Sequence, residues 1–81
     1  MVFKIKDEVK WAFGEGSNYT VIATSEIPYE RINKELVYPE SHSNYVIVQI
    51  SNADQDIDSL PFYHVPEAHL ELIKSYPEKT K

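Results

Sequence analysis

The sequence contains no cysteine and only two glycines among its 81 residues. Without cysteine, the chain has no disulfide framework and no thiolate ligand for a metal. A chain of this length forms one domain, and so small a domain buries only about 60% of the surface that its unfolded chain exposes. We therefore expect a single domain of modest stability.

Long apolar runs are lacking as well. No run approaches the ~20 residues that a membrane-spanning helix needs. Residues 1–6 alternate between apolar and basic side chains, and they do not contain the apolar stretch of a signal peptide. We therefore expect a soluble cytoplasmic protein that does not contact a membrane.

An excess of positive charge is also absent, because 13 acidic residues against 8 basic ones give a formal net charge of −5. This balance argues against general nucleic-acid binding, which depends on neutralising phosphates. A short lysine strip remains at Lys4, Lys6 and Lys10, but alternate positions of a half-buried strand face water in any case. A nucleic-acid-associated module that uses this strip is an alternative hypothesis.

Short apolar stretches with alternating polarity predict an all-β or mainly β fold. Residues 45–50, Tyr-Val-Ile-Val-Gln-Ile, form the strongest predicted strand, because most are β-branched and none is charged, glycine or proline. We expect this strand to be central, with Val46, Val48 and Ile50 in the core. The other predicted strands are residues 2–5, 9–13, 19–24, 60–65 and 69–73.

The second predicted strand places Val9, Trp11 and Phe13 on one inward face. A loop follows at residues 14–18, and it contains both glycines of the chain. A chain that uses glycine so rarely is expected to need it for positive φ, so these residues predict a hairpin loop.

Residues 25–44 admit two interpretations. Tyr29, Ile32 and Leu36 have the spacing of one face of a short helix. Residues 35–38, Glu-Leu-Val-Tyr, instead favour an extra edge strand in a long, bent hairpin. We prefer the hairpin and keep the helix as the alternative.

Two stretches of the sequence resemble small SH3-like barrels. Residues 3–11, Phe-Lys-Ile-Lys-Asp-Glu-Val-Lys-Trp, are similar to the F-x-x-G-D-x-V opening of SH3-like and KOW-like domains, with Lys6 in the place of glycine. Residues 65–73, Val-Pro-Glu-Ala-His-Leu-Glu-Leu-Ile, resemble the V-P-x-x-x-L-x-x-I turn and closing strand of the same superfold.

The resemblance implies one SH3-like barrel over residues 1–74, with about five to six antiparallel strands and one short helical or 3-10 turn. Residues 75–81 are expected to form a polar C-terminal tail. Because this superfold serves many unrelated functions, including peptide, RNA and protein binding, the resemblance implies no site residues.

A calcium loop is suggested by residues 54–58, Asp-Gln-Asp-Ile-Asp, but the pattern is incomplete. An EF-hand loop needs glycine at its sixth position and glutamate at its twelfth, where this chain has Ser59 and Val65. We expect a solvated acidic loop, whose charges protect neighbouring strand edges from aggregation.

Catalytic or metal-binding patterns are weak elsewhere. His64 and His69 are separated by five positions, so together with Glu67 they are only weak candidates for a metal site. No nucleophile elbow of the form G-x-S-x-G is present. We expect no enzymatic activity, no metal and no cofactor, with a small metal-dependent or hydrolytic enzyme centred on His64 and His69 as a rival hypothesis.

The aromatic residues are the main functional lead. A tyrosine hydroxyl needs a partner or water, and tyrosine and tryptophan are enriched in binding hot spots. We expect tyrosines to be half-exposed along a groove between residues 14–18 and residues 25–44, because SH3-like barrels bind extended peptides in aromatic-lined grooves. The candidate binding residues are Trp11, Tyr19, Tyr29, Tyr38, Tyr45 and Tyr63.

These observations predict a non-enzymatic interaction module whose aromatic surface and acidic rim bind a protein or peptide partner. The net charge of −5 favours a basic partner through long-range steering. A structural subunit that pairs with its own copy through an exposed strand edge is a further alternative.

Overall fold

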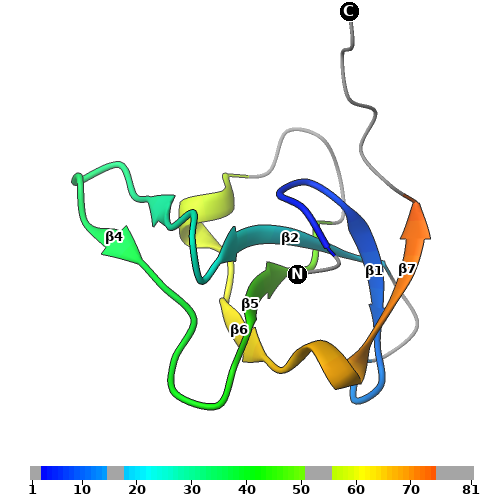
Figure 1. The fold of residues 1–81 in the computed structure, drawn as a ribbon. Coiled ribbons are helices and arrows are strands. Elements are labelled where there is room, and N and C mark those ends of the chain that lie inside the picture. Colours follow the sequence, from blue (N-terminus) through cyan, green and yellow to red (C-terminus); the bar gives the residue numbers. More distant parts are fainter. Residues whose placement is uncertain (1–2, 15–17, 51–55, 75–81) are drawn as a thin grey trace, which may run out of the picture.

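The computed structural model describes residues 3–14, 18–50 and 56–74, and it contains mainly strands (Figure 1). The strands are β1 (Glu8–Trp11), β2 (Tyr19–Thr24), β3 (Tyr29–Glu30), β4 (Leu36–Val37), β5 (Tyr45–Val48), β6 (Tyr63–Val65) and β7 (Leu70–Lys74). Two 3-10 turns precede the last two strands, η1 (Ile57–Ser59) and η2 (Glu67–His69). Among the described residues, no helix is long and apolar enough to cross a membrane. The predicted all-β class is confirmed.

Five strands form one antiparallel sheet in the order β6-β5-β2-β1-β7, while β3 and β4 form a separate two-stranded hairpin. The edge strands β6 and β7 are not neighbours in this order, so the sheet is not closed. The predicted central strand, β5, lies inside the sheet, and β2 occupies the middle position. The predicted hairpin in residues 25–44 is confirmed, and the alternative helix is wrong.

The strand β5 is buried on both faces, because a layer of side chains covers each side of the sheet. Tyr45 and Ile47 belong to one core, and Val46 and Val48 belong to the other. The first core also contains Phe3, Val9, Tyr19, Val21 and Val65. The second contains Ile22 and Ala23, with Tyr29, Val37, Ile50, Ile57, Leu60 and Phe62 packed against it. The hairpin therefore covers the face of Val46 and Val48.

The predicted strand at residues 2–5 is wrong within the described residues, which form a turn before β1. Lys6 has a φ of 76°, which a strand does not accommodate. The Asp7 carboxylate accepts a hydrogen bond from the Lys4 backbone N–H at 2.8 Å, and the Asp7 N–H donates to the Lys4 carbonyl at 3.0 Å. Both bonds close the turn, which leaves Phe3 buried and Lys6 exposed.

Gly14 is required by close packing rather than by a positive φ. A Cβ at this position would lie 2.5 Å from the ring of Tyr19, a distance that side-chain contacts do not reach. The Gly14 N–H donates to the Trp11 carbonyl at 3.0 Å, which turns the chain directly after β1. Residues 15–17 of the predicted loop, and the predicted tail at residues 75–81, lie outside the described residues.

The left-handed backbone of Lys6 yields a first prediction. We expect Lys6→Gly to raise the free energy of unfolding by about 0.5 kcal/mol, because relief of about 1–2 kcal/mol of strain outweighs the added entropy of the unfolded chain. Lys10→Gly, inside β1, is the matched control and should lower it by about 0.5–1 kcal/mol. Urea denaturation measures both changes, and a Lys6→Gly protein less stable than the wild type would contradict the prediction.

Candidate functional site

The β3–β4 hairpin extends away from the main sheet, at the left of Figure 1, and carries exposed apolar side chains. Ile32, in the turn between the two strands, is 85% exposed, and Leu36 and Tyr38 are each 51% exposed. Leu36 belongs to β4, and Tyr38 comes directly after this strand. We call Ile32, Leu36 and Tyr38 the hairpin surface.

The opposite face of the hairpin packs on the protein. Tyr29 lies directly across from Val37 in the hairpin, and both pack against the second core. The ring of Tyr29 meets Phe62 edge-on, with the ring centroids 5.5 Å apart. The hairpin thus has a structural inner face and a free outer face.

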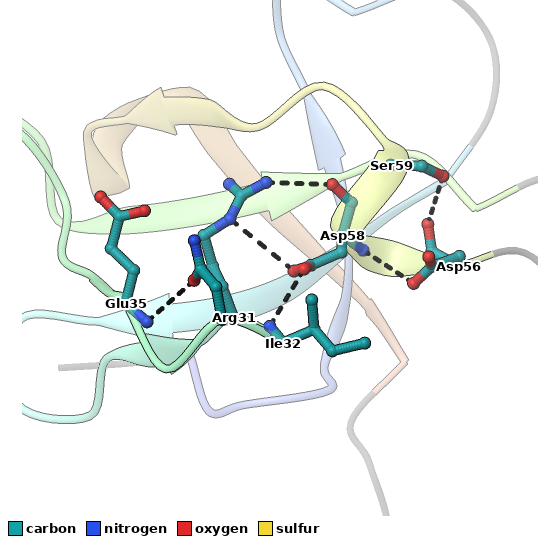
Figure 2. A network of polar contacts seen from close by, with 7 residues as sticks. Arg31, Ile32, Glu35, Asp56, Asp58 and Ser59 are labelled. Atoms are coloured by element: carbon teal, nitrogen blue, oxygen red, sulfur yellow. Dashed lines mark hydrogen bonds and ion pairs between the residues drawn. The ribbon is translucent and has the colours of Figure 1, made fainter.

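A polar network around Asp58 holds the tip of the hairpin on η1, as Figure 2 shows. The Asp58 carboxylate accepts a hydrogen bond from the Ile32 backbone N–H at 3.0 Å. The Arg31 guanidinium donates to the Asp58 carbonyl at 3.2 Å, and its Nε lies 3.9 Å from the Asp58 Oδ1. Arg31 also lies over the ring of Phe62, 5.0 Å from its centroid. Since Asp58 is only 13% exposed, these contacts are shielded from water.

The turn η1 is itself fixed by short-range hydrogen bonds (Figure 2). The Asp56 carboxylate caps the turn by accepting a hydrogen bond from the Asp58 N–H at 3.2 Å. The Ser59 hydroxyl donates to the Asp56 carbonyl at 2.8 Å. Asp56 and Asp58 belong to the segment that resembled a calcium loop, and here they cap a turn and dock the hairpin. Residues 51–55 lie outside the described part of the chain.

Hydrogen bonds within the hairpin shape its tip. The Arg31 N–H donates to the Glu35 carbonyl at 2.8 Å, and the Lys34 N–H donates to the Arg31 carbonyl at 2.8 Å. The Glu35 N–H donates to the Asn33 side-chain oxygen at 3.0 Å, and Lys34 adopts a φ of 74°. The tip therefore presents Ile32 from a hydrogen-bonded turn.

The charge around the hairpin surface is mainly negative. Four exposed glutamates lie in residues 25–40, and this segment contains two basic residues, Arg31 and Lys34. Arg31 forms an ion pair with Asp58, so its charge is already partnered. The glutamates are Glu26, Glu30, Glu35 and Glu40. The hairpin surface is therefore apolar and lies in a segment that carries four exposed glutamates.

The other predicted aromatic residues do not join this surface. Trp11, Tyr19 and Tyr63 pack together in or against the first core, on the opposite face of the main sheet. The ring centroid of Trp11 lies 5.7 Å from that of Tyr19 and 5.2 Å from that of Tyr63. The six candidates therefore do not line one groove.

Tyr19 and Tyr45 are buried, so the expectation that they are half-exposed is wrong. The Tyr45 hydroxyl finds its partners inside the protein: it accepts from the Phe3 N–H at 3.1 Å and donates to the Glu67 carboxylate at 3.4 Å. Tyr19 packs its ring between Trp11 and the backbone of Gly14. Ring packing and internal hydrogen bonds satisfy both tyrosines without solvent.

Phe13 was expected in the core, but it is 68% exposed because β1 ends at Trp11 and the chain turns at residues 12–13. Its ring meets His69 edge-on, with centroids 4.8 Å apart. The Trp11 indole N–H is buried and has no hydrogen-bond acceptor among the residues that the structure describes.

The three weak metal candidates have separate partners. His64 accepts a hydrogen bond through Nδ1 from the Glu40 N–H at 3.2 Å, and His69 contacts Phe13. Glu67 accepts from the Tyr45 hydroxyl. No group of three histidine, aspartate or glutamate side chains able to hold a metal occurs in residues 3–14, 18–50 and 56–74.

The lysine strip is divided between two local structures. Lys4 and Lys6 belong to the turn before β1, and Lys10 lies within β1. Lys10 stands directly opposite Glu71 of β7, so a residue of opposite charge lies beside it in the sheet. This arrangement does not favour a continuous track for phosphates.

Comparisons with protein-family models, curated proteins and solved structures find no match to this chain. The assignment of a function therefore rests on the geometry of its own residues.

The Asp58 network yields a second prediction. We expect Asp58→Ala to lower the free energy of unfolding by about 1–3 kcal/mol, because the Ile32 N–H loses its shielded acceptor and Arg31 loses its ion-pair partner. Amide hydrogen exchange at Ile32 should accelerate at the same time. Glu30→Ala, at an exposed position of the same hairpin, is the control and should change stability by less than about 0.5 kcal/mol. Equal effects of the two substitutions would contradict the docking role of Asp58.

The environment of Tyr29 yields a third prediction. Burial raises the pKa of Tyr29 above 10.0, the nearby Asp58 carboxylate raises it further, and Arg31 partly opposes this rise. The unfolded chain therefore loses this proton first, so the stabilising contribution is complete below about pH 10 and is lost as the pH rises through the raised pKa. Tyr29→Phe should reduce the alkaline loss of stability in denaturation curves between about pH 8 and 11. The same substitution at exposed Tyr38 should leave this loss unchanged.

Proposed function

We propose that this chain is an SH3-like domain that acts as a non-enzymatic interaction module and binds a protein or peptide partner through its hairpin surface. The observation that carries this proposal is the docked hairpin. Its inner face and tip are held by packing and by the Asp58 network, while Ile32, Leu36 and Tyr38 remain exposed.

The SH3-like assignment is supported by two features of the resembling stretches. Lys6 stands at the position where SH3-like openings have glycine, and its φ of 76° is a conformation that glycine adopts without strain. Residues 65–73 contain the 3-10 turn η2 and the closing strand β7, in the order that the V-P-x-x-x-L-x-x-I pattern implies.

Binding at the hairpin surface is favoured by energetics. Burial of one large aliphatic or aromatic side chain contributes roughly 1.5–3 kcal/mol relative to its exposed state. A partner that covers Ile32, Leu36 and Tyr38 gains this energy at three positions. Because the hairpin is already held in place, binding costs little ordering of its backbone.

The charged residues around the hairpin surface indicate the chemistry of the partner. Four exposed glutamates in residues 25–40 favour lysine and arginine on the partner through complementary potentials. We therefore expect apolar anchor residues flanked by basic ones. The aromatic contribution comes from the exposed Tyr38, while Tyr29 packs on the second core and supports the hairpin.

The fourth prediction tests this binding surface with random peptides displayed on phage and selected on the wild-type protein. We expect the selected peptides to carry apolar residues flanked by lysine or arginine. Ile32→Ser and Tyr38→Ala should each weaken such a peptide by about tenfold, equivalent to about 1.4 kcal/mol. Higher salt should weaken binding further, because the surrounding charges are exposed.

Phe13→Ser is the matched control, since Phe13 is an exposed apolar residue outside the hairpin. This control should leave the affinity unchanged, and circular dichroism should show that each variant is folded. Selected peptides that bind Ile32→Ser and Tyr38→Ala as tightly as the wild type would overturn the proposed surface. Selected peptides that are acidic would overturn the predicted charge of the partner.

A further inference from the structure

The strand β7 forms one edge of the main sheet, at the right of Figure 1. Among the described residues it pairs only with β1. Two large apolar side chains of this edge strand, Leu72 and Ile73, are each 46% exposed. An exposed edge strand offers unpaired backbone groups to a further strand.

The register of β1 and β7 indicates which backbone groups point outward. The Ala12 N–H donates to the His69 carbonyl at 2.9 Å, so these two residues form a hydrogen-bonded pair. The pairs that follow are Trp11 with Leu70, Lys10 with Glu71, and Val9 with Leu72. Hydrogen-bonded and non-hydrogen-bonded pairs alternate along an antiparallel ladder. The last pair is therefore non-hydrogen-bonded, and the N–H and C=O of Leu72 point away from β1.

We propose that β7 pairs antiparallel with β7 of a second copy of this chain, around a two-fold axis at Leu72. In this register the Leu72 N–H donates to the Leu72 carbonyl of the second copy, and the reverse bond forms by symmetry. A two-fold axis normal to the sheet keeps equivalent side chains on the same face, so the two Leu72 side chains meet across the axis. Such an isologous contact closes on itself.

The side chains of β7 are compatible with this register. Beside the axis, Glu71 stands opposite Ile73 of the second copy, so no like charges are directly opposed there. The pairing also covers the apolar surface that Leu72 and Ile73 expose in the single chain. Pairing with a second copy gives hydrogen-bond partners to the outward backbone groups of β7 in both chains at once. We therefore assign β7 of a second copy, and not an unrelated strand, to this edge.

The same strand keeps the association weak. Val9 pairs with Leu72 and Glu8 with Lys74, so Ile73 is an extra residue at a β-bulge. A bulge bends the edge and limits the length that a second strand can pair with. A five-residue strand buries less than the about 1,600 Å² of a standard stable interface. The dimer is therefore a concentration-dependent one, with a dissociation constant between about 1 µM and about 1 mM.

The fifth prediction concerns this dimer and uses sedimentation velocity of the full chain between about 0.1 µM and about 1 mM. The sedimentation coefficient of the wild type should rise from the monomer value toward the dimer value. Leu72→Pro should abolish the rise, because it removes the outward N–H without removing a bond to β1. Leu72→Lys should abolish it as well, because two lysines would then face each other across the axis.

Ile32→Lys is the matched control, since it places the same charge on the exposed hairpin surface, and it should dimerise like the wild type. The dependence on salt distinguishes dimerisation from partner binding. Higher ionic strength should strengthen the dimer by screening the −5 charge of each copy, whereas it should weaken binding of a basic partner. A wild type that remains monomeric at every concentration would overturn the dimer and leave the hairpin proposal intact. Folded Leu72→Lys protein that dimerises like the wild type would also overturn it.

Discussion

The pair of strands β2 and β5 is apolar on both faces, and a chain of 81 residues has to cover both of them. The first core uses residues from the N-terminal turn, β1 and β6 to cover one face. The other face receives the hairpin, η1 and the segment before β6. The hairpin and η1, which lie outside the main sheet, are thus committed to a covering role. This requirement explains why residues 25–44, which lack the pattern of a long strand or helix, nevertheless take one defined conformation.

A hairpin of two short strands has little apolar surface with which to hold its place, so polar contacts complete the docking. Asp58 supplies them from η1, because its carboxylate binds the Ile32 N–H while Arg31 bridges to its backbone. Hydrogen bonds are directional, so this network fixes the orientation of the hairpin as well as its position. The consequence is a division of roles within the ten residues 29–38: the side chains that face inward are structural, and Ile32, Leu36 and Tyr38 remain exposed.

The sequence predicted the parts of the fold that depend on local pattern. Residues 19–24 form a strand over their full predicted range, and the proline after Val65 precedes a 3-10 turn as expected. Long-range contacts escaped prediction. Arg31 and Asp58 are 27 positions apart, and nothing in their local sequence pairs them. The sequence also did not predict which tyrosines are buried. The Tyr45 hydroxyl, for example, bonds to the Phe3 N–H and to Glu67, which only the folded chain brings near it. Phe13 continues the apolar alternation of Val9 and Trp11, but β1 ends at Trp11, so Phe13 is exposed and not in the core.

The two proposed surfaces occupy different parts of the molecule and depend on opposite physical conditions. The hairpin and β7 lie on opposite sides of the main sheet in Figure 1, so pairing through β7 leaves the hairpin of each copy accessible. A dimer then presents two equivalent hairpin surfaces. For a partner with two binding segments, the second contact becomes intramolecular, and avidity rises without any new contact. Weak self-association and modest binding at each hairpin are therefore consistent with one another, because a bivalent partner that binds both copies also stabilises the dimer by mass action.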